Sequence, residues 1–373
     1  MLNSLSTWRG SLQIHAYARK RFAVNPRVLS RLTGYYISFI KKQCNLGHSG
    51  YKCLDAHRAH ILALQSNCHD AGQKEATCSI TWAIKDYLDL RGYWIDRILI
   101  LEKGLSSARA ANDRYGEGAF LTSLGWTYNK LGKYRQAKDL LEQALTIAQQ
   151  MKDRDGEGGS LINIAISCNL LGEHKKAIEL CDLALSIAKE IEDNDLESAA
   201  INNKGIAFYY LGETRLAIDY YKKGLSIIQE NENKSKEANA LCCLGVAFSD
   251  LGENQLAIEF YEKYWAIASK KGNRQAEGNY LCNMGIIYNN LGDCSKSIKL
   301  FERALVIFRD IGDRLGEGNA LHNMSLALNK NEERGKAIEN ATSALTIFEK
   351  IESPRAAKAK RNLAEWKVSE HDA

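Results

Sequence analysis

Apolar residues in the segment 153–190 recur at the spacing of two amphipathic helices. The first stripe runs i, i+3, i+4, i+7 and consists of Leu161, Ile164, Ala165 and Cys168. Gly172 follows, and glycine suits the left-handed residue that ends a helix. The second stripe consists of Ala177, Ile178, Cys181, Ala184, Leu185 and Ala188. The segment therefore predicts two α-helices joined by a tight turn, with Asp153 as the N-cap of the first helix.

The same pair of stripes is repeated along most of the chain with a fixed period of 40 residues. The dipeptide Leu-Gly stands at 131–132, 171–172, 211–212, 251–252 and 291–292. A small residue lies seven positions before each of these glycines, and we expect it to let the two helices approach closely. Because Ala165 stands where a later copy has Gly205, we expect Gly205→Ala to be tolerated. An invariant period of this length is typical of a solenoid, in which each unit contacts only its neighbours.

The repeated residues resemble the tetratricopeptide repeat over roughly residues 78–357. One unit carries the small residues Gly125, Ala137 and Ala144 and the large residues Leu121, Leu124, Tyr128 and Leu141. The resemblance implies an all-α fold, a right-handed superhelical solenoid of helix-turn-helix repeats. The usual repeat has about 34 residues. We therefore expect the extra residues of this chain to lengthen the helices, the second one especially.

The repeats divide the chain into an N-terminal segment, a series of repeats and a cap. We expect a basic helical segment at 1–77 and a degenerate repeat at 78–117, where Lys85 replaces the small residue. Regular repeats are expected at 118–157, 158–197, 198–237, 238–277, 278–317 and 318–357. A C-terminal capping helix and tail at 358–373 would solvate the exposed end of the solenoid.

The charge is distributed unevenly along the chain. The net charge is +5, yet no Asp or Glu precedes Asp55, whereas nine Lys or Arg do. Such a segment could contact nucleic acid or serve as an organelle transit peptide. A third interpretation, which we prefer, is a basic helical segment that once faced another domain. Tyr35, Tyr36 and Phe39 favour a packed helix there over a disordered tail.

Cysteine usage and hydropathy favour a cytoplasmic protein. The ten cysteines are scattered and have no CxxC spacing, so free thiols in a reducing cytosol fit best. No apolar run approaches the roughly 20 residues of a membrane-spanning helix. The first 22 residues also lack the continuous hydrophobic region of a secretory signal.

Four short motifs resemble, in the same order, the region between the winged helix and the sensor repeats of NB-ARC-type (STAND) signalling ATPases. They lie at 14–20, 34–37, 51–64 and 87–94. The resemblance implies the sensor half of such a protein, or a decayed descendant, with a separate NTPase or effector domain as a partner. The sequence has no GxxxxGK[ST] phosphate loop. We therefore expect neither ATPase activity nor a bound cofactor.

Eight cysteine and histidine residues lie within 35 positions in the N-terminal region. They are Cys44, His48, Cys53, His57, His60, Cys68, His69 and Cys78. Two pairs have i, i+4 spacing, but the CxxC knuckle of common zinc sites is absent. We therefore prefer buried cysteines and surface histidines on amphipathic helices over a metal site. No spacing pairs a nucleophile with a base, so an enzyme is not expected.

Two columns of polar residues are candidates for the concave groove, the surface with which a solenoid binds its ligands. One column reads Ser123, Asn163, Asn203, Cys243, Asn283 and Asn323, and the other reads Ala119, Gly159, Ala199, Asn239, Asn279 and Asn319. The resemblance implies that both columns line the groove and that asparagine there contacts a bound peptide. The candidate peptide-binding residues are Asn163, Asn203, Asn239, Asn279, Asn283, Asn290, Asn319, His322, Asn323 and Lys330.

A ladder of asparagines can satisfy the backbone of an extended peptide, because each amide offers donors and acceptors without charge. The alternative is that these asparagines cap or bridge adjacent helices. Ile162, Ile166 and Leu170 make the N-terminal half of the groove more apolar, which suits a ligand with one apolar and one polar end. We predict a scaffold or sensor that binds a peptide or partner protein. The alternative function is the regulatory half of a signalling or transcription factor whose basic segment contacts nucleic acid.

Overall fold

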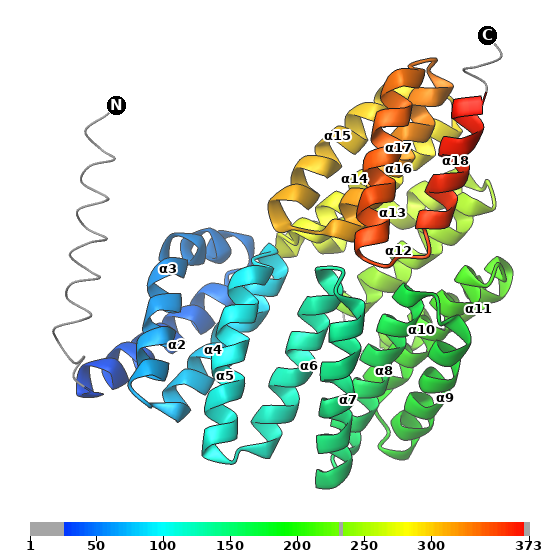
Figure 1. Ribbon diagram of the computed structural model, residues 1–373. Coiled ribbons are helices and arrows are strands. Elements are labelled where there is room, and N and C mark those ends of the chain that lie inside the picture. Colours follow the sequence, from blue (N-terminus) through cyan, green and yellow to red (C-terminus); the bar gives the residue numbers. More distant parts are fainter. Residues whose placement is uncertain (1–25, 231–233, 369–373) are drawn as a thin grey trace, which may run out of the picture.

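The computed structural model describes residues 26–230 and 234–368, and the chain over these residues is a series of stacked helices (Figure 1). Two helices come first, α2 (Pro26–Asn45) and α3 (His48–Asp70). Seven antiparallel pairs follow: α4 (Lys74–Arg91) and α5 (Trp94–Ala111), α6 (Arg114–Lys130) and α7 (Tyr134–Met151), α8 (Arg154–Leu171) and α9 (His174–Glu190), α10 (Asn194–Tyr210) and α11 (Thr214–Glu230), α12 (Lys234–Asp250) and α13 (Asn254–Ala268), α14 (Arg274–Asn290) and α15 (Cys294–Ile311), and α16 (Arg314–Lys330) and α17 (Arg334–Lys350). The last helix is α18 (Ala356–Val368). The predicted all-α solenoid of helix-turn-helix repeats is confirmed.

The turn signals of the sequence fix where the helices begin and end. Asp153 caps α8, because its carboxylate accepts a hydrogen bond from the Gly156 N–H. Gly172 ends the same helix with φ 85°, a conformation in which a Cβ would clash. Both helices of a pair have 17 or 18 residues in most repeats, and α13 has only 15. The expectation that mainly the second helix is lengthened is therefore wrong, since the extra length is shared.

The helix pairs are out of phase with the repeat boundaries expected from the sequence. The first helix of each regular repeat begins four residues earlier, at 114, 154, 194, 234, 274 and 314. The segment expected to be a degenerate repeat contributes the pair α4 and α5, although Lys85 occupies the small-residue position. Described helices thus extend the repeat architecture to the N-terminal side of the regular copies.

Within each pair, a small residue on the first helix faces a side chain of matching size on the second. A methyl group on Gly205 would lie 2.7 Å from Cε1 of the buried Tyr221. In the preceding repeat, Ala165 instead shares a buried cluster with the smaller Cys181. The close approach to Tyr221 argues against the expectation that Gly205→Ala is tolerated. Alanine is accommodated at position 165 because the facing residue on the second helix is the small Cys181, whereas Gly205 faces the larger Tyr221.

The solenoid coils far enough for its C-terminal repeats to stack on its N-terminal repeats (Figure 1). A methyl group on Gly92, in the turn between α4 and α5, would lie 2.5 Å from Cγ2 of Ile311 at the end of α15. Trp94 and Tyr134 belong to the same hydrophobic core as residues of α14 to α17. The expectation that each repeat contacts only its neighbours is therefore wrong for this chain. We call the contact between successive turns of the superhelix the seam.

None of the described helices is both long enough and apolar enough to cross a membrane.

Candidate peptide-binding groove

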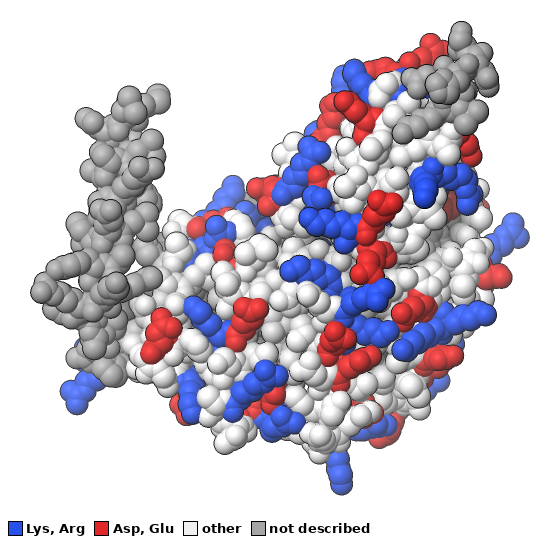
Figure 2. Space-filling model, viewed as in Figure 1, with Lys and Arg blue, Asp and Glu red and all other residues white. Residues whose placement is uncertain are grey.

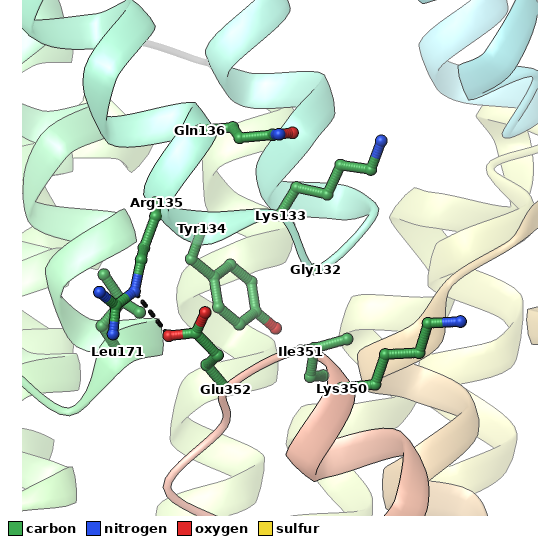
Figure 3. A pocket seen from close by; sticks show the side chains of 9 residues that line it. All are labelled: Gly132, Lys133, Tyr134, Arg135, Gln136, Leu171, Lys350, Ile351 and Glu352. Carbon is green, nitrogen blue, oxygen red and sulfur yellow. Dashed lines mark hydrogen bonds and ion pairs between the residues drawn. The ribbon is translucent and has the colours of Figure 1, made fainter.

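The seam brings together residues that are more than 200 positions apart in the sequence (Figure 3). The turn at Gly132 and Tyr134 lies on one side, and the end of α17 with Ile351 lies on the other, around a hollow of about 220 Å³. Arg135 forms an ion pair with Glu352, with 2.5 Å between Nε and Oε2. Both side chains of that pair are exposed, so apolar packing of Tyr134 and Ile351 contributes more to closure than the ion pair.

A second set of seam contacts consists of polar side chains inside the superhelix. Lys130 Nζ donates to Gln275 Oε1 at 2.8 Å, and Gln275 Nε2 donates to Asp313 Oδ2 at 2.8 Å. Burial lowers the pKa of Lys130 and raises that of Asp313. Arg355 reaches across the seam and donates to the Tyr210 hydroxyl at 2.8 Å. The bonds of Gln275 to Lys130 across the seam and to Asp313 of the next repeat satisfy partly buried polar groups, whereas the Arg355–Tyr210 bond is exposed.

The candidate asparagines near the N-terminal half bond within their own helices. Asn163 Nδ2 donates to the carbonyl of Gly159, and Asn203 Nδ2 donates to that of Ala199, both at 2.9 Å. Each side chain is half-buried. A bond to the carbonyl four residues earlier is a common way for a mid-helix amide to be satisfied. For these two residues the geometry fits the alternative in which asparagines serve the helices rather than a ligand.

Two asparagines in the C-terminal half bond across adjacent repeats. Asn283 Nδ2 lies 3.6 Å from the Cys242 sulfur, and the Asn323 amide is hydrogen-bonded to the Cys282 thiol. A thiol is a weak acceptor, so each amide has a poor intramolecular partner. Burial raises the pKa of both thiols to about 12, which keeps them neutral.

The other candidates do not form one uniform row. Their hydrogen bonds join Asn319 to Arg355, Asn290 to Asn254, Lys330 to Asn289 and Asn279 to Tyr264. Asn239 is exposed. His322 is buried, with 7% of its surface exposed, and neither ring nitrogen has a hydrogen-bond partner. Burial, together with Lys358 and Arg355, lowers the pKa of His322 to about 4.

A hollow that the polar columns do not indicate lies between α4, α6, α7 and α8. Its volume is about 290 Å³, and we call it the N-terminal hollow. It is lined by Trp82, Arg114, Tyr115, Gly118, Ala119, Thr122, Ser123, Ala144, Ile147, Ala148, Met151, Asp153, Asp155, Gly156, Gly159 and Ser160. Ala119 and Gly159 belong to one of the two groove columns, and their small size is the sequence signal that could have revealed it.

The cysteine- and histidine-rich stretch is spread over α2, α3 and α4. Cys68 lies 3.6 Å from the Thr33 hydroxyl, and His69 Nδ1 lies 3.1 Å from the Ser107 hydroxyl. His57 Nδ1 is 2.9 Å from the carbonyl of Cys53. Among the described residues, no three His, Cys, Asp or Glu side chains are grouped so that they could hold a metal ion.

Three of the four N-terminal motifs lie on described helices, and two of them pack against each other. The motif at 14–20 lies outside the described residues. Asp55 of α3 accepts hydrogen bonds from Tyr87 at 2.6 Å, Tyr93 at 2.9 Å and Arg91 at 2.8 Å. Burial opposes ionisation of Asp55, but these hydrogen bonds outweigh it and lower the pKa. The motifs at 51–64 and 87–94 thus fix α3 against the first helix pair.

Sequence comparison decides the family of these repeats. Residues 158–230 and 275–350 match one tetratricopeptide repeat family model, and residues 119–151 match a second. These matched residues form tetratricopeptide repeats. No match is found among curated proteins.

Solved structures of similar fold include regulators and a signalling ATPase. A Rap protein complexed with competence and sporulation factor is 15% identical, with a TM-score of 0.63 over 91% of this chain and 99% of that chain. The Rap conjugation gene regulator of plasmid pLS20, in complex with the Phr* peptide, is 15% identical, with a TM-score of 0.64 over 77% of each chain. A STAND protein with a tetratricopeptide repeat sensor, from Pyrococcus horikoshii, is 17% identical, with a TM-score of 0.52 over 94% of this chain and 51% of that chain.

Proposed function

We propose that the protein is a cytoplasmic, non-catalytic scaffold or sensor that binds an extended peptide, or an extended segment of a partner protein, along its groove. The observation that carries this proposal is the pair of thiol-bonded amides at Asn283 and Asn323. An amide that leaves a thiol for a peptide carbonyl gains a stronger hydrogen bond, so ligand binding costs little intramolecular stability.

Two further observations support the proposal. Two Rap proteins of similar fold have been solved with competence and sporulation factor and with the Phr* peptide. On the face of the molecule in Figure 2, positive and negative side chains are interspersed. That face therefore offers no continuous basic stripe, which is the electrostatic footprint of nucleic-acid binding. A separate NTPase or effector domain would be the partner that reads the state of this sensor.

The test compares affinity with stability after the partner has been captured from the native organism. Asn283→Ala and Asn323→Ala should each weaken partner binding by about 0.5–1.5 kcal/mol, the net value of one neutral hydrogen bond. The melting temperature should change little, because each variant removes only a bond to sulfur. Calorimetric titration and thermal melts measure the two effects.

The matched control is Lys299→Ala on α15, where the side chain is exposed. It should change neither affinity nor melting temperature. A fall in melting temperature without a specific loss of affinity would mean that the asparagines serve to bridge adjacent helices. The groove proposal would then be wrong.

A further inference from the structure

The N-terminal hollow gathers large apolar side chains that are exposed to solvent. Trp82 is 36% exposed, Tyr115 is 62% exposed and Met151 is 44% exposed. Each comes from a different helix or helix end, and all three line the same hollow. Exposed apolar side chains that converge on a concave surface are typical of a binding site, whereas singly scattered ones are not.

The hollow is open at its base because the residue there, Gly159, has no side chain. A methyl group built on Gly159 meets no atom within 4 Å, so the space above this glycine is open. Later copies of the same column carry Ala199 and then Asn239, which would fill that space. At about 290 Å³ the hollow is near the lower limit of ~300 Å³ for small-ligand pockets. It therefore fits one bulky side chain of a longer ligand.

The charge at the rim of the hollow is acidic. Asp153 and Asp155 line it, and the one basic lining residue, Arg114, is already bonded to Glu117 and Gln150. The Asp155 side chain is exposed at this rim. Partial desolvation and the nearby carboxylates of Asp193 and Asp153 raise the pKa of Asp155, and the cation of Lys236 opposes this shift. A cation from a ligand would relieve this repulsion.

We propose that the N-terminal hollow is the anchor subsite of the groove. It takes one bulky apolar side chain of an extended peptide, and Asp155 binds a Lys or Arg next to that side chain. This inference rests on the proposed function and specifies the ligand as an apolar-basic segment. The charge of the rim selects this occupant over an acidic one.

The test uses three fluorescein-labelled decapeptides with one alanine-glutamine host sequence. Their central residues are Lys-Trp-Lys, Glu-Trp-Glu and Lys-Ala-Lys, and binding is measured by fluorescence polarisation. The Lys-Trp-Lys peptide should bind best to the unmodified protein. Gly159→Leu should weaken its binding about tenfold or more, because the leucine occupies the space of the anchor. Asp155→Asn should weaken it about two- to fivefold and should leave the Glu-Trp-Glu peptide no weaker.

The control for Gly159→Leu is Gly335→Leu. Gly335 also lies in a helix, α17, and a methyl group built on it meets no atom within 4 Å. Both leucine variants should melt at or above the temperature of the unmodified protein, because leucine favours a helix more than glycine does. Only Gly159→Leu should lose binding.

Three results would overturn the inference. In the first, the unmodified protein and Gly159→Leu bind the Lys-Trp-Lys peptide equally well. In the second, the unmodified protein binds the Glu-Trp-Glu peptide as tightly as the Lys-Trp-Lys peptide. In the third, it binds none of the peptides. Binding of the captured partner to the same variants distinguishes failure of this inference from failure of the proposed function. If Asn283→Ala weakens partner binding and Gly159→Leu does not, the anchor is wrong and the groove stands. If neither weakens it, the proposed function fails.

Discussion

The seam can be tested with two glycines that differ only in their surroundings. Gly132 and Gly252 both occupy the Leu-Gly turn of a repeat and both have positive φ, 75° and 78°. A methyl group on Gly132 would lie 2.6 Å from Cγ2 of Ile351 across the seam, whereas one on Gly252 would meet no atom within 4 Å. Alanine at either position therefore has the same backbone strain, and only Gly132→Ala collides with another turn of the superhelix.

The expected magnitudes follow from these contacts. Forcing an alanine into the left-handed region costs about 1 kcal/mol, and this cost applies to both variants. Overpacking adds about 1–3 kcal/mol at Gly132 alone. We therefore expect Gly252→Ala to lower the free energy of unfolding by ~1 kcal/mol and Gly132→Ala to lower it by ~2–4 kcal/mol. If the seam opens to relieve the collision, the radius of gyration rises instead.

Urea denaturation measures the stability of each variant, and small-angle X-ray scattering measures its size. The double variant Gly132→Ala/Ile351→Ala removes the Cγ2 atom that the new methyl meets. Its cost should be smaller than the sum of the two single costs, as expected for residues in direct contact. Equal costs for Gly132→Ala and Gly252→Ala, with unchanged radii of gyration, would refute the seam.

Two further predictions concern single buried sites. Gly205→Ala should cost about 1–3 kcal/mol by overpacking Tyr221, and in urea denaturation the cost of Gly205→Ala/Tyr221→Cys should be smaller than the sum of the two single costs. His322 is held neutral beside Arg355 and Lys358, with its pKa lowered from about 6.5 to about 4. Below pH 6.5 the unfolded chain takes up a proton at His322 that the folded protein does not bind. The free energy of unfolding therefore falls by about 1.4 kcal/mol per pH unit between pH 6.5 and pH 4, and the full contribution is present above pH 6.5. His322→Leu should remove this pH dependence of the free energy of unfolding between pH 7 and pH 5. The variant should be at least as stable as the unmodified protein at pH 7, because the buried ring nitrogens of His322 lack hydrogen-bond partners.

The local features of the fold could be predicted because each depends on residues close in sequence. The apolar stripe at Leu161 and Cys168, the cap at Asp153 and the turn at Gly172 all act within one helix pair. The fixed period then implies that the same geometry recurs. The size of each partner on the second helix was also in the sequence, at Cys181 and Tyr221. The expectation for Gly205 considered one column without the other, and the contact with Tyr221 argues against it.

The seam could not be predicted from the repeat pattern. Whether a solenoid meets itself depends on the small rotation between successive repeats, which accumulates over the whole chain. A signal existed nonetheless at the first residue of the second helix. Repeats on one side of the seam carry Trp94 and Tyr134 there, and repeats away from it carry Thr214 and Asn254. Large aromatic residues at only some copies of a turn mark contacts outside the repeat itself.

The candidate site was predicted in part. The columns placed Asn283 and Asn323 on first helices of adjacent repeats, which the structure bears out. Their bonds to the thiols of the preceding repeats could not be read from the columns, because they depend on the offset between neighbouring helices. The N-terminal hollow was missed for a different reason. The hollow is present because Gly159 has no side chain, and a pattern of polar residues does not single out a glycine.

The seam and one column of the predicted groove share a residue. Arg355 bonds both Asn319 in a groove column and Tyr210 on the opposite turn of the superhelix. His322 is buried near the same arginine, whereas Asn319 and Asn323 on that helix are half-buried. The N-terminal hollow has no lining residue from the C-terminal repeats and is open to a ligand with the seam closed. A peptide that bonds to the Asn319 amide would therefore compete with Arg355, which also bonds to Tyr210 across the seam.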